Sequence, residues 1–197
     1  MNNQLRDAAL EYAEAGWSVV PVSAGRKHPP LVEWKQYQEK AATPDDIRNW
    51  WDATPDANIA VVTGAVSNIT VVDLDGEKGR ESFQNELNSL PQTRVHRTPK
   101  GYHLVFEFTK ELTTGAAFLP GIDIRSEGGY ILAPPSVVAG KPYLVHKDRP
   151  AVALNGAVPE TLKRVRPGIR QAAPEDEQPG WVSEALAKGA PKEQRNN

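Results

Sequence analysis

Apolar residues recur at helical spacing near the N-terminus, and the stretches that follow are short and apolar. Between positions 5 and 12 they follow the i, i+3, i+4, i+7 spacing of an amphipathic helix, which Gly16 ends. Residues 17–22 then form a short apolar run that predicts a strand. A second helix is predicted from Thr43, because a threonine N-cap, Pro44 at the first helical position and two acids in the first turn favour a helix start.

The middle of the chain reads mainly as strands. Phe83, Leu87 and Leu90 have helical spacing, so they predict one further helix, stopped by Pro91. The Gly128-Gly129 pair lies between two strand-like runs and predicts a hairpin-like turn. This mixture favours an α+β fold, or an α/β fold with a mixed sheet. The predicted strands are 59–63, 69–75, 102–108, 122–126, 130–133 and 143–146.

The composition changes after about Leu154, where prolines punctuate a polar stretch. We therefore expect a folded domain over residues 1–154 and a Pro-rich linker or tail over 155–197, with room for a short helix around 181–188. Between positions 141 and 170, seven Lys or Arg outnumber two acids, for a local net charge of +5. Such a run is either a solvated surface or a track for a phosphate backbone.

The bulk composition excludes several classes of protein. With 197 residues, 39% hydrophobic and 24% charged, the chain fits one ordinary soluble domain. Its net charge of −2 means that any nucleic-acid contact must come from a local patch. There is no cysteine, which excludes thiolate metal sites and fits a reducing cytoplasm. We expect no membrane contact, since no apolar run approaches the roughly 18 residues of a membrane span.

The segment 69–76 carries the most informative chemistry: an apolar strand that ends in Asp73 and Asp75. Side chains alternate along a strand, so both carboxylates leave on the same face. Two like charges this close repel unless water or a cation lies between them. One interpretation is a strand end followed by an Asp-Gly turn. The other is a site for a divalent metal that holds phosphate oxygens.

Two later segments supply partners for that pair. His103 follows the turn Thr98-Pro99-Lys100-Gly101, near the start of a strand; a lone histidine there is more often structural. Asp123 lies between two isoleucines, where an ionised carboxylate is costly without a partner. Either Arg125 lies too far round the strand and Asp123 faces a metal, or Asp123 is salt-bridged elsewhere; we favour the metal. The nearby donors for phosphate oxygens are Arg97, Lys100, His103 and Arg125.

The order of these motifs resembles the bifunctional primase–polymerase domain of the archaeo-eukaryotic primase superfamily. The likeness rests on Asp-Leu-Asp, then Thr-Pro-Lys-Gly-Tyr-His, then Ile-Asp-Ile-Arg-Ser-Glu-Gly-Gly-Tyr-Ile-Leu-Ala-Pro-Pro-Ser. It covers roughly residues 10–149 and includes the Lys27-His28-Pro29-Pro30 loop and Trp34. The resemblance implies an RRM-like sheet that holds the acids, beside a smaller N-terminal α/β subdomain. It also implies a replication protein of a plasmid, phage or integrated element.

The resemblance implies a role for each matching residue. Asp73, Asp75 and Asp123 would bind two Mg²⁺ or Mn²⁺ ions, and His103 would contact the triphosphate of an NTP or dNTP. Gly101 stands where the superfamily often has serine. Ser136 would border the nucleotide. A single-stranded DNA template would follow basic residues, and a C-terminal helicase region would belong to the same parent chain. The expected DNA-binding residues are Lys27, Lys141, Lys147, Arg149, Lys163 and Arg164.

Two other functions compete with nucleotidyl transfer. A haloacid-dehalogenase-like phosphatase also has a strand ending in Asp-x-Asp-Gly, but its motif continues with Thr or Ser, and here Glu77 follows Gly76. A non-catalytic primase-like module would hold DNA or a nucleotide without chemistry. The presence of three acids and His103 argues against such a degenerate site.

Overall fold

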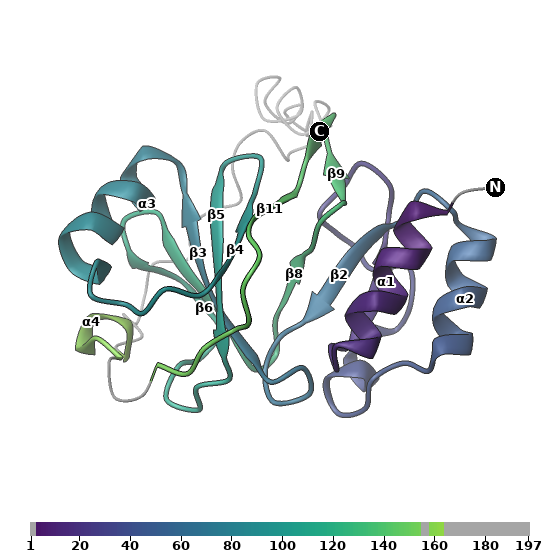
Figure 1. Ribbon diagram of the computed structural model, residues 1–197, viewed down its shortest axis with the longest axis horizontal. Helices are drawn as coiled ribbons and strands as arrows, with labels where there is room; N and C mark the ends of the chain where they lie inside the picture. The colour runs from purple at the N-terminus through teal and green to yellow at the C-terminus, as the bar shows by residue number, and fades with distance from the viewer. Residues whose placement is uncertain (1–2, 155–157, 164–197) are drawn as a thin grey trace, which may run out of the picture. The chain divides into compact units, whose positions relative to one another are not determined.

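The computed structural model describes residues 3–154 and 158–163 (Figure 1). The helical elements are α1 (Gln4–Glu14), α2 (Pro44–Ala53), α3 (Gly76–Ser82), α4 (Glu160–Lys163), the 3₁₀ helix η1 (Trp34–Gln38) and the π-helical segment η2 (Phe83–Leu87). The strands are β1 (Val19–Val22), β2 (Asn58–Val62), β3 (Ile69–Asp75), β4 (Arg94–Arg97), β5 (Gly101–Glu107), β6 (Gly115–Leu119), β7 (Ile122–Arg125), β8 (Tyr130–Leu132), β9 (Val137–Val138), β10 (Lys141–Pro142) and β11 (Leu144–Lys147).

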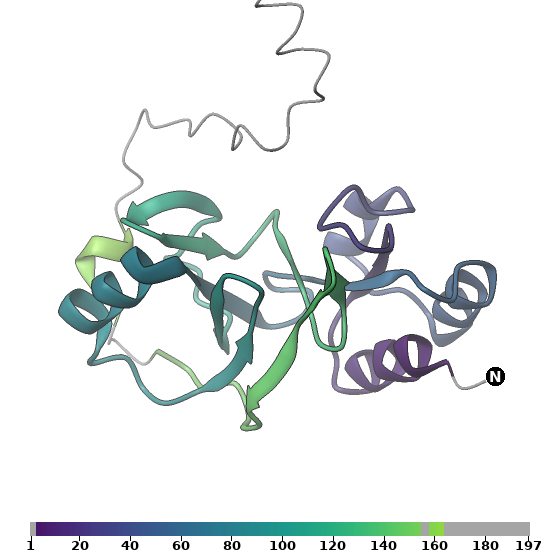
Figure 2. The same ribbon diagram turned by 90° about the horizontal axis from the view of Figure 1, so that it is seen from above.

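The N-terminal part of the chain and the later strand β8 build a small sheet with helices beside it. Strands β1, β2 and β8 form a three-stranded antiparallel sheet, and α1 and α2 lie next to each other at this end of the chain (Figures 1 and 2). The predicted start of α2 is confirmed: Thr43 and Asp46 form a reciprocal capping box. Ile47 and Trp51 on α2 are fully buried in the same core as Ile59 and Val61 of β2.

The second sheet has six strands in the order β11-β4-β5-β3-β7-β6, with β3 near its centre. Its two faces belong to different cores because side chains alternate along each strand. On one face, Val71 and Val105 pack into the core shared with the three-stranded sheet. On the reverse face, Val72 and Ile124 pack with residues of η2 and α4. Helix α3 begins directly after Asp75, so the acidic end of β3 runs straight into a helix.

The α+β class is confirmed, but two expectations about the sheet are wrong. The paired strands are antiparallel, so the sheet is not mixed. The predicted hairpin around Gly128-Gly129 does not form, because β7 joins the six-stranded sheet and β8 joins the three-stranded one. Strands β4 and β6 had no predicted counterpart. The short helix expected at 181–188 lies outside the described residues, and the domain boundary at residue 154 stays a prediction.

Candidate active site

Three polar side chains lie in a row across the middle of the six-stranded sheet. Asp73 on β3 is directly opposite His103 on β5 and directly opposite Asp123 on β7; we call these three residues the Asp73 row. Residues paired in this way project from the same face of a sheet. Asp75 lies two residues further along the same face, opposite Gly101. The strand register therefore brings together residues that are up to 50 positions apart in the sequence.

The carboxylates on β3 are held in a setting that disfavours negative charge. Desolvation by burial raises the pKa of Asp73 to about 6, and the charge of Asp123 adds to this, whereas Arg125 and Lys27 act in the opposite direction. Desolvation, followed by the charge of Asp73, also raises the pKa of Asp75. A cation beside these oxygens would relieve both effects. The electrostatics of the site thus favour a positively charged ligand.

His103 is a neutral imidazole at physiological pH. Burial lowers its pKa to about 3, and the positive charge of Lys27 acts in the same direction. Its Nε2 lies 3.5 Å from Oδ1 of Asp73, a contact that is therefore not an ion pair. Its Nδ1 is buried and has no hydrogen-bond partner within the described residues. A buried nitrogen without a partner points to a ligand that completes its hydrogen bonding.

Asp123 forms a salt bridge with Arg125, whereas the sequence interpretation favours a metal at this carboxylate; its metal-binding role stays a prediction. Arg125 lies on the same strand face, and its Nη2 is 3.0 Å from Oδ2 of Asp123. The other oxygen, Oδ1, accepts a hydrogen bond of 2.9 Å from the backbone N–H of Ala117. The expectation that Arg125 lies too far round the strand is wrong, because residues i and i+2 share a face. Arg125 neutralises Asp123 in this structure.

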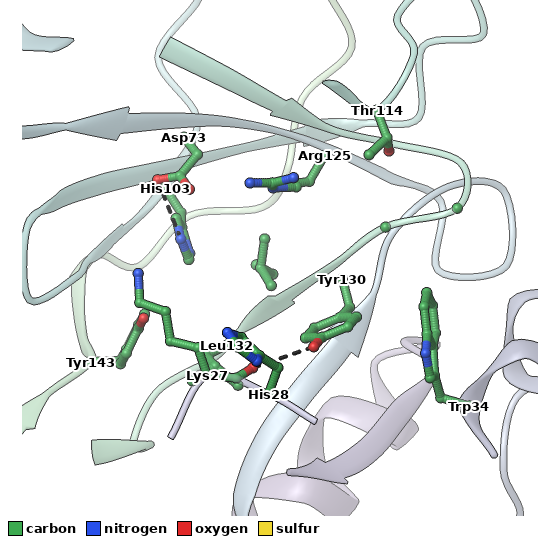
Figure 3. Close-up of a pocket in the computed structure, with 13 residues that line it drawn as sticks. Lys27, His28, Trp34, Asp73, His103, Thr114, Arg125, Tyr130, Leu132 and Tyr143 are labelled. Carbon is green, nitrogen blue, oxygen red and sulfur yellow. Dashed lines mark hydrogen bonds and ion pairs between the residues drawn. The ribbon is translucent and has the colours of Figure 1, made fainter. Parts of the chain in front are cut away.

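Asp73 and His103 of this row line a cleft of about 330 Å³ between the two sheets, whereas Asp123 is outside its lining (Figure 3). One wall carries Asp73, His103 and Arg125, and the opposite wall carries Lys27 from the loop after β1. Figure 3 shows the Lys27 side chain extending toward Asp73 and His103. The Tyr130 hydroxyl donates to the backbone carbonyl of Lys27 at 3.4 Å, which ties this loop to β8. The sequence interpretation puts Lys27 on the template track, but the structure places it in the cleft.

Aromatic side chains that line the cleft were not identified as site residues from the sequence. Trp34 and Tyr130 meet edge to face with ring centroids 5.1 Å apart, and both line the cleft. Tyr143 lies with its ring 5.8 Å from the His103 ring. Desolvation raises the pKa of the Tyr143 hydroxyl, and the charges of Asp73 and Asp75 act in the same direction. The Gly128-Gly129 pair was a usable signal for Tyr130, because glycine allows the backbone to approach a ligand closely and all three residues line the cleft.

Other predicted nucleotide contacts lie elsewhere. Arg97 is directly opposite Tyr102, one position out of phase with His103, so it projects from the reverse face of the sheet. Ser136 is fully buried and is absent from the cleft lining; its hydroxyl accepts a hydrogen bond from the backbone N–H of Ile59 at 2.9 Å. Lys100 lies in the turn before β5, and its charge partly opposes the desolvation that raises the pKa of Asp75. Of these three, Lys100 alone acts on the acidic residues.

The predicted basic track is divided among different elements. Lys141 lies on β10 and Lys147 on β11, and both are exposed. Arg149 donates to the side chain of Gln92. Lys163 on α4 pairs with Glu160 at 2.7 Å, and Arg164 lies outside the described residues.

The carboxylate set fits a hard divalent cation by its chemistry, since Mg²⁺ and Mn²⁺ prefer oxygen ligands. Its geometry is less complete: within residues 3–154 and 158–163, no group of three or more His, Asp or Glu side chains is arranged to hold a metal ion. The Arg125–Asp123 pair accounts for part of this, because it occupies oxygens that a metal would need. For Asp123 to share a cation with Asp73 and Asp75, Arg125 would have to turn away from it.

Comparison with known families gives one match. The family model of the bifunctional DNA primase/polymerase N-terminal domain matches residues 9–160 of this chain. A search of curated proteins finds no match. In the described part of the chain, no helix has the length and apolar character needed to cross a membrane.

Proposed function

Because this chain belongs to the bifunctional DNA primase/polymerase family, we propose that it carries out template-directed nucleotidyl transfer, as a DNA primase, a DNA polymerase or both. In this reaction the 3′-oxygen of a growing strand attacks the α-phosphorus of an NTP or dNTP. A new P–O bond forms, the bond to the β-phosphate breaks, and pyrophosphate leaves with the electron pair. Replication of a plasmid, phage or integrated element is the context that the family resemblance suggests.

The Asp73 row is the observation that carries this proposal. Asp73 and His103 of this row face a cleft whose opposite wall supplies Lys27, so an acid and a cation meet across the space that a triphosphate would occupy. A phosphatase of the haloacid-dehalogenase type is not supported, since the chain matches another family and Glu77 replaces the expected hydroxyl residue. The cleft favours a phosphate-bearing, metal-associated substrate.

Asp73 and Asp75 would hold Mg²⁺ or Mn²⁺, with Asp123 joining them once Arg125 moves. When bound, two such ions lower the pKa of an attacking hydroxyl and neutralise the triphosphate. Arg125 would then be free to donate to a phosphate oxygen. In the tautomer that carries its proton on Nδ1, His103 would donate a hydrogen bond to the same group without adding charge.

The first test is nucleotide incorporation on a single-stranded template, with labelled NTPs or dNTPs and with or without a primer. We expect products with Mg²⁺ or Mn²⁺ and none after chelation with EDTA. The unprimed reactions separate synthesis of new chains from extension. No incorporation with either metal, on primed and unprimed templates alike, would contradict the proposal.

A non-catalytic module is the second candidate, and the Arg125–Asp123 pair is the observation that favours it. Such a module would bind nucleotide with no need for metal at Asp123. The Asp73→Ala variant separates the two: the catalytic proposal expects loss of synthesis with nucleic-acid binding retained. The module instead expects binding without any incorporation by the unmodified chain, and an Asp73→Ala protein unchanged in both respects would reject the metal-binding role of Asp73.

Replacing Lys27 by Ala is expected to raise the KM for the incoming nucleotide by about 10- to 100-fold, the usual effect of losing a hydrogen bond to a charged group. Lys27 faces the Asp73 row across the cleft, and its charge acts on Asp73, Asp75 and His103. Steady-state kinetics with a saturating primed template measure this effect. The matched control is Lys141→Ala, which removes an exposed lysine outside the cleft lining. Equal KM values for the Lys27 and Lys141 variants would exclude a triphosphate contact by Lys27.

A further inference from the structure

A second, larger groove lies on the reverse face of the six-stranded sheet. It has a volume of about 610 Å³, and its floor includes Leu74 on β3, Leu104 on β5 and Val95 on β4. These residues alternate with Asp73, His103 and His96, so the groove is on the opposite side of the sheet from the Asp73 row. Residues of η2 and the segment after it form one rim, and β11 with the residues after it forms another. The proposed chemistry uses none of these side chains.

The charged side chains that line this groove are all positive. Arg80, Lys147 and Arg149 line it, and no carboxylate does. Arg97 projects from the same sheet face, directly opposite Tyr102. Arg80 pairs with Glu77, whereas Lys147 and Arg97 make no ion pair within the described residues. The overall charge of the chain is −2, so this local concentration of cations differs from the rest of the surface.

Flat side chains lie among these cations. The rings of Tyr102 and His146 are 5.4 Å apart at an interplanar angle of 52°, and both line the groove. Phe83 lines it from the η2 side. The groove therefore combines apolar and aromatic surface with Lys and Arg side chains, and no carboxylate lines it. Such a surface suits a ligand in which flat rings alternate with negative charges. Single-stranded nucleic acid has this pattern, since its bases stack on aromatic side chains while its phosphates meet Lys and Arg.

We propose that this reverse-face groove binds single-stranded DNA, with a base against Tyr102 and phosphates near Lys147 and Arg149. The groove would hold a stretch of template or product strand outside the cleft where nucleotides react. The inference deepens the proposed function and rests on it for the identity of the strand. Arg97, which the sequence interpretation assigns to the nucleotide, projects from this same face of the sheet.

Fluorescence anisotropy with a labelled oligo-dT of about 12 nucleotides, within the site sizes typical of single-strand binders, tests the groove on the full chain. We expect Lys147→Ala/Arg149→Ala to weaken binding at least 10-fold. The slope of log K against log salt should fall in magnitude by roughly 1.4, about 0.7 for each phosphate that is no longer neutralised. Tyr102→Ala should weaken binding about 5- to 100-fold through the loss of base stacking, and Tyr102→Phe should restore it. Lys40→Ala is the matched control, because Lys40 is exposed and lies outside the groove lining, and it should bind like the unmodified chain.

Several results would overturn the inference. These are unchanged affinity in the Lys147/Arg149 variant, an equal loss in the Lys40 control, or tighter binding to a blunt duplex than to oligo-dT. Self-association of the chain that Tyr102→Ala abolishes would also overturn it, because the groove would then hold a second copy. Circular dichroism of each variant shows whether it is folded. If Tyr102→Ala does not fold, the test rests on Tyr102→Phe and on the Lys147/Arg149 variant.

Failure of this inference can be told apart from failure of the proposed function. The Asp73→Asn variant should lose incorporation while keeping its affinity for oligo-dT, because Asp73 lies on the other face of the sheet. If Asp73→Asn still incorporates nucleotides, the proposed function fails whatever the groove binds. If the groove variants bind oligo-dT like the unmodified chain while Asp73→Asn loses incorporation, the reverse-face site is rejected and the proposed function stands.

Discussion

Replacing Asp73 by Asn is expected to reduce nucleotide incorporation on the order of 10³-fold or more, since it removes the central carboxylate of the proposed metal site. Asp73 is the residue that pairs with both His103 and Asp123 across the sheet. The amide keeps the size and shape of the side chain, so the loss would report charge rather than packing. Single-turnover incorporation with Mn²⁺ and with Mg²⁺ measures it. Incorporation within 10-fold of the unmodified chain would contradict the metal-binding role.

The same substitution should stabilise the fold at neutral pH. Burial raises the pKa of Asp73 to about 6 from its ordinary value of 3.8, so the folded state holds a proton that the unfolded chain releases between these two values. As pH rises through this window, the unmodified protein loses stability, up to roughly 3 kcal/mol at pH 7 and above. Asn carries no charge, so Asp73→Asn escapes this loss.

Thermal unfolding at pH 4 and pH 8, without divalent metal, measures this second effect. Asp73→Asn should exceed the unmodified chain in Tm at pH 8, and the difference should shrink at pH 4. Asp56→Asn, at an exposed turn residue, is the matched control and should leave the Tm unchanged at both pH 4 and pH 8. Added Mn²⁺ should raise the Tm of the unmodified chain but not that of Asp73→Asn. A lower Tm for Asp73→Asn at pH 8 would show that the Asp73 charge is well solvated or paired.

Gly101→Ala is expected to destabilise the fold by about 3 kcal/mol or more, through overpacking of the sheet beside the Asp73 row. A Cβ atom at Gly101 would lie 1.8 Å from the carbonyl oxygen of Leu74 and 2.9 Å from its carbonyl carbon. Both atoms belong to the backbone of β3, so no side-chain rotation relieves the contact. Strands β3 and β5 would have to separate where Asp75 pairs with Gly101. In this chain the serine common at this position in the superfamily would meet the same contact.

Thermal or urea unfolding checks the Gly101 prediction, and a loss of about 6–12 °C in Tm corresponds to this free energy for a chain of this size. Gly128→Ala is the control that separates a steric contact from backbone strain. Gly128 has a positive φ of 76°, and no atom lies within 4 Å of the point that a Cβ would occupy, so strain of about 1 kcal/mol is its expected cost. Equal losses for the two variants would mean that β3 and β5 adjust freely around Gly101.

The local elements of the site could be predicted from the sequence because their geometry depends on neighbours in the chain. Alternation along a strand is enough to place Asp73 and Asp75 on one face. The Thr43 N-cap needs four consecutive residues, and the structure contains it. The order of the motifs indicated the family, and the family model matches residues 9–160. None of these inferences requires knowing which strand lies beside which.

The tertiary structure decided what depends on pairing between distant strands. A shift of one residue in register turns a side chain to the other face of a sheet. This is why His103 faces the cleft while Arg97, close to it in the sequence, projects from the reverse face. Ser136 also depends on a distant segment: its hydroxyl is buried against Ile59 of β2, a contact that its neighbours in the sequence do not predict.

By itself, the sequence determined that three acids and a histidine exist in strand-like settings, since strand periodicity and turn chemistry are local properties. The tertiary structure alone decided that Asp123, Asp73 and His103 form one row, because antiparallel pairing of β7, β3 and β5 sets their register. It also decided that Lys27 completes the cleft from a loop that precedes the row by more than 40 residues in the chain. Long-range contacts of this kind arise from the packing of two sheets, which no local pattern encodes.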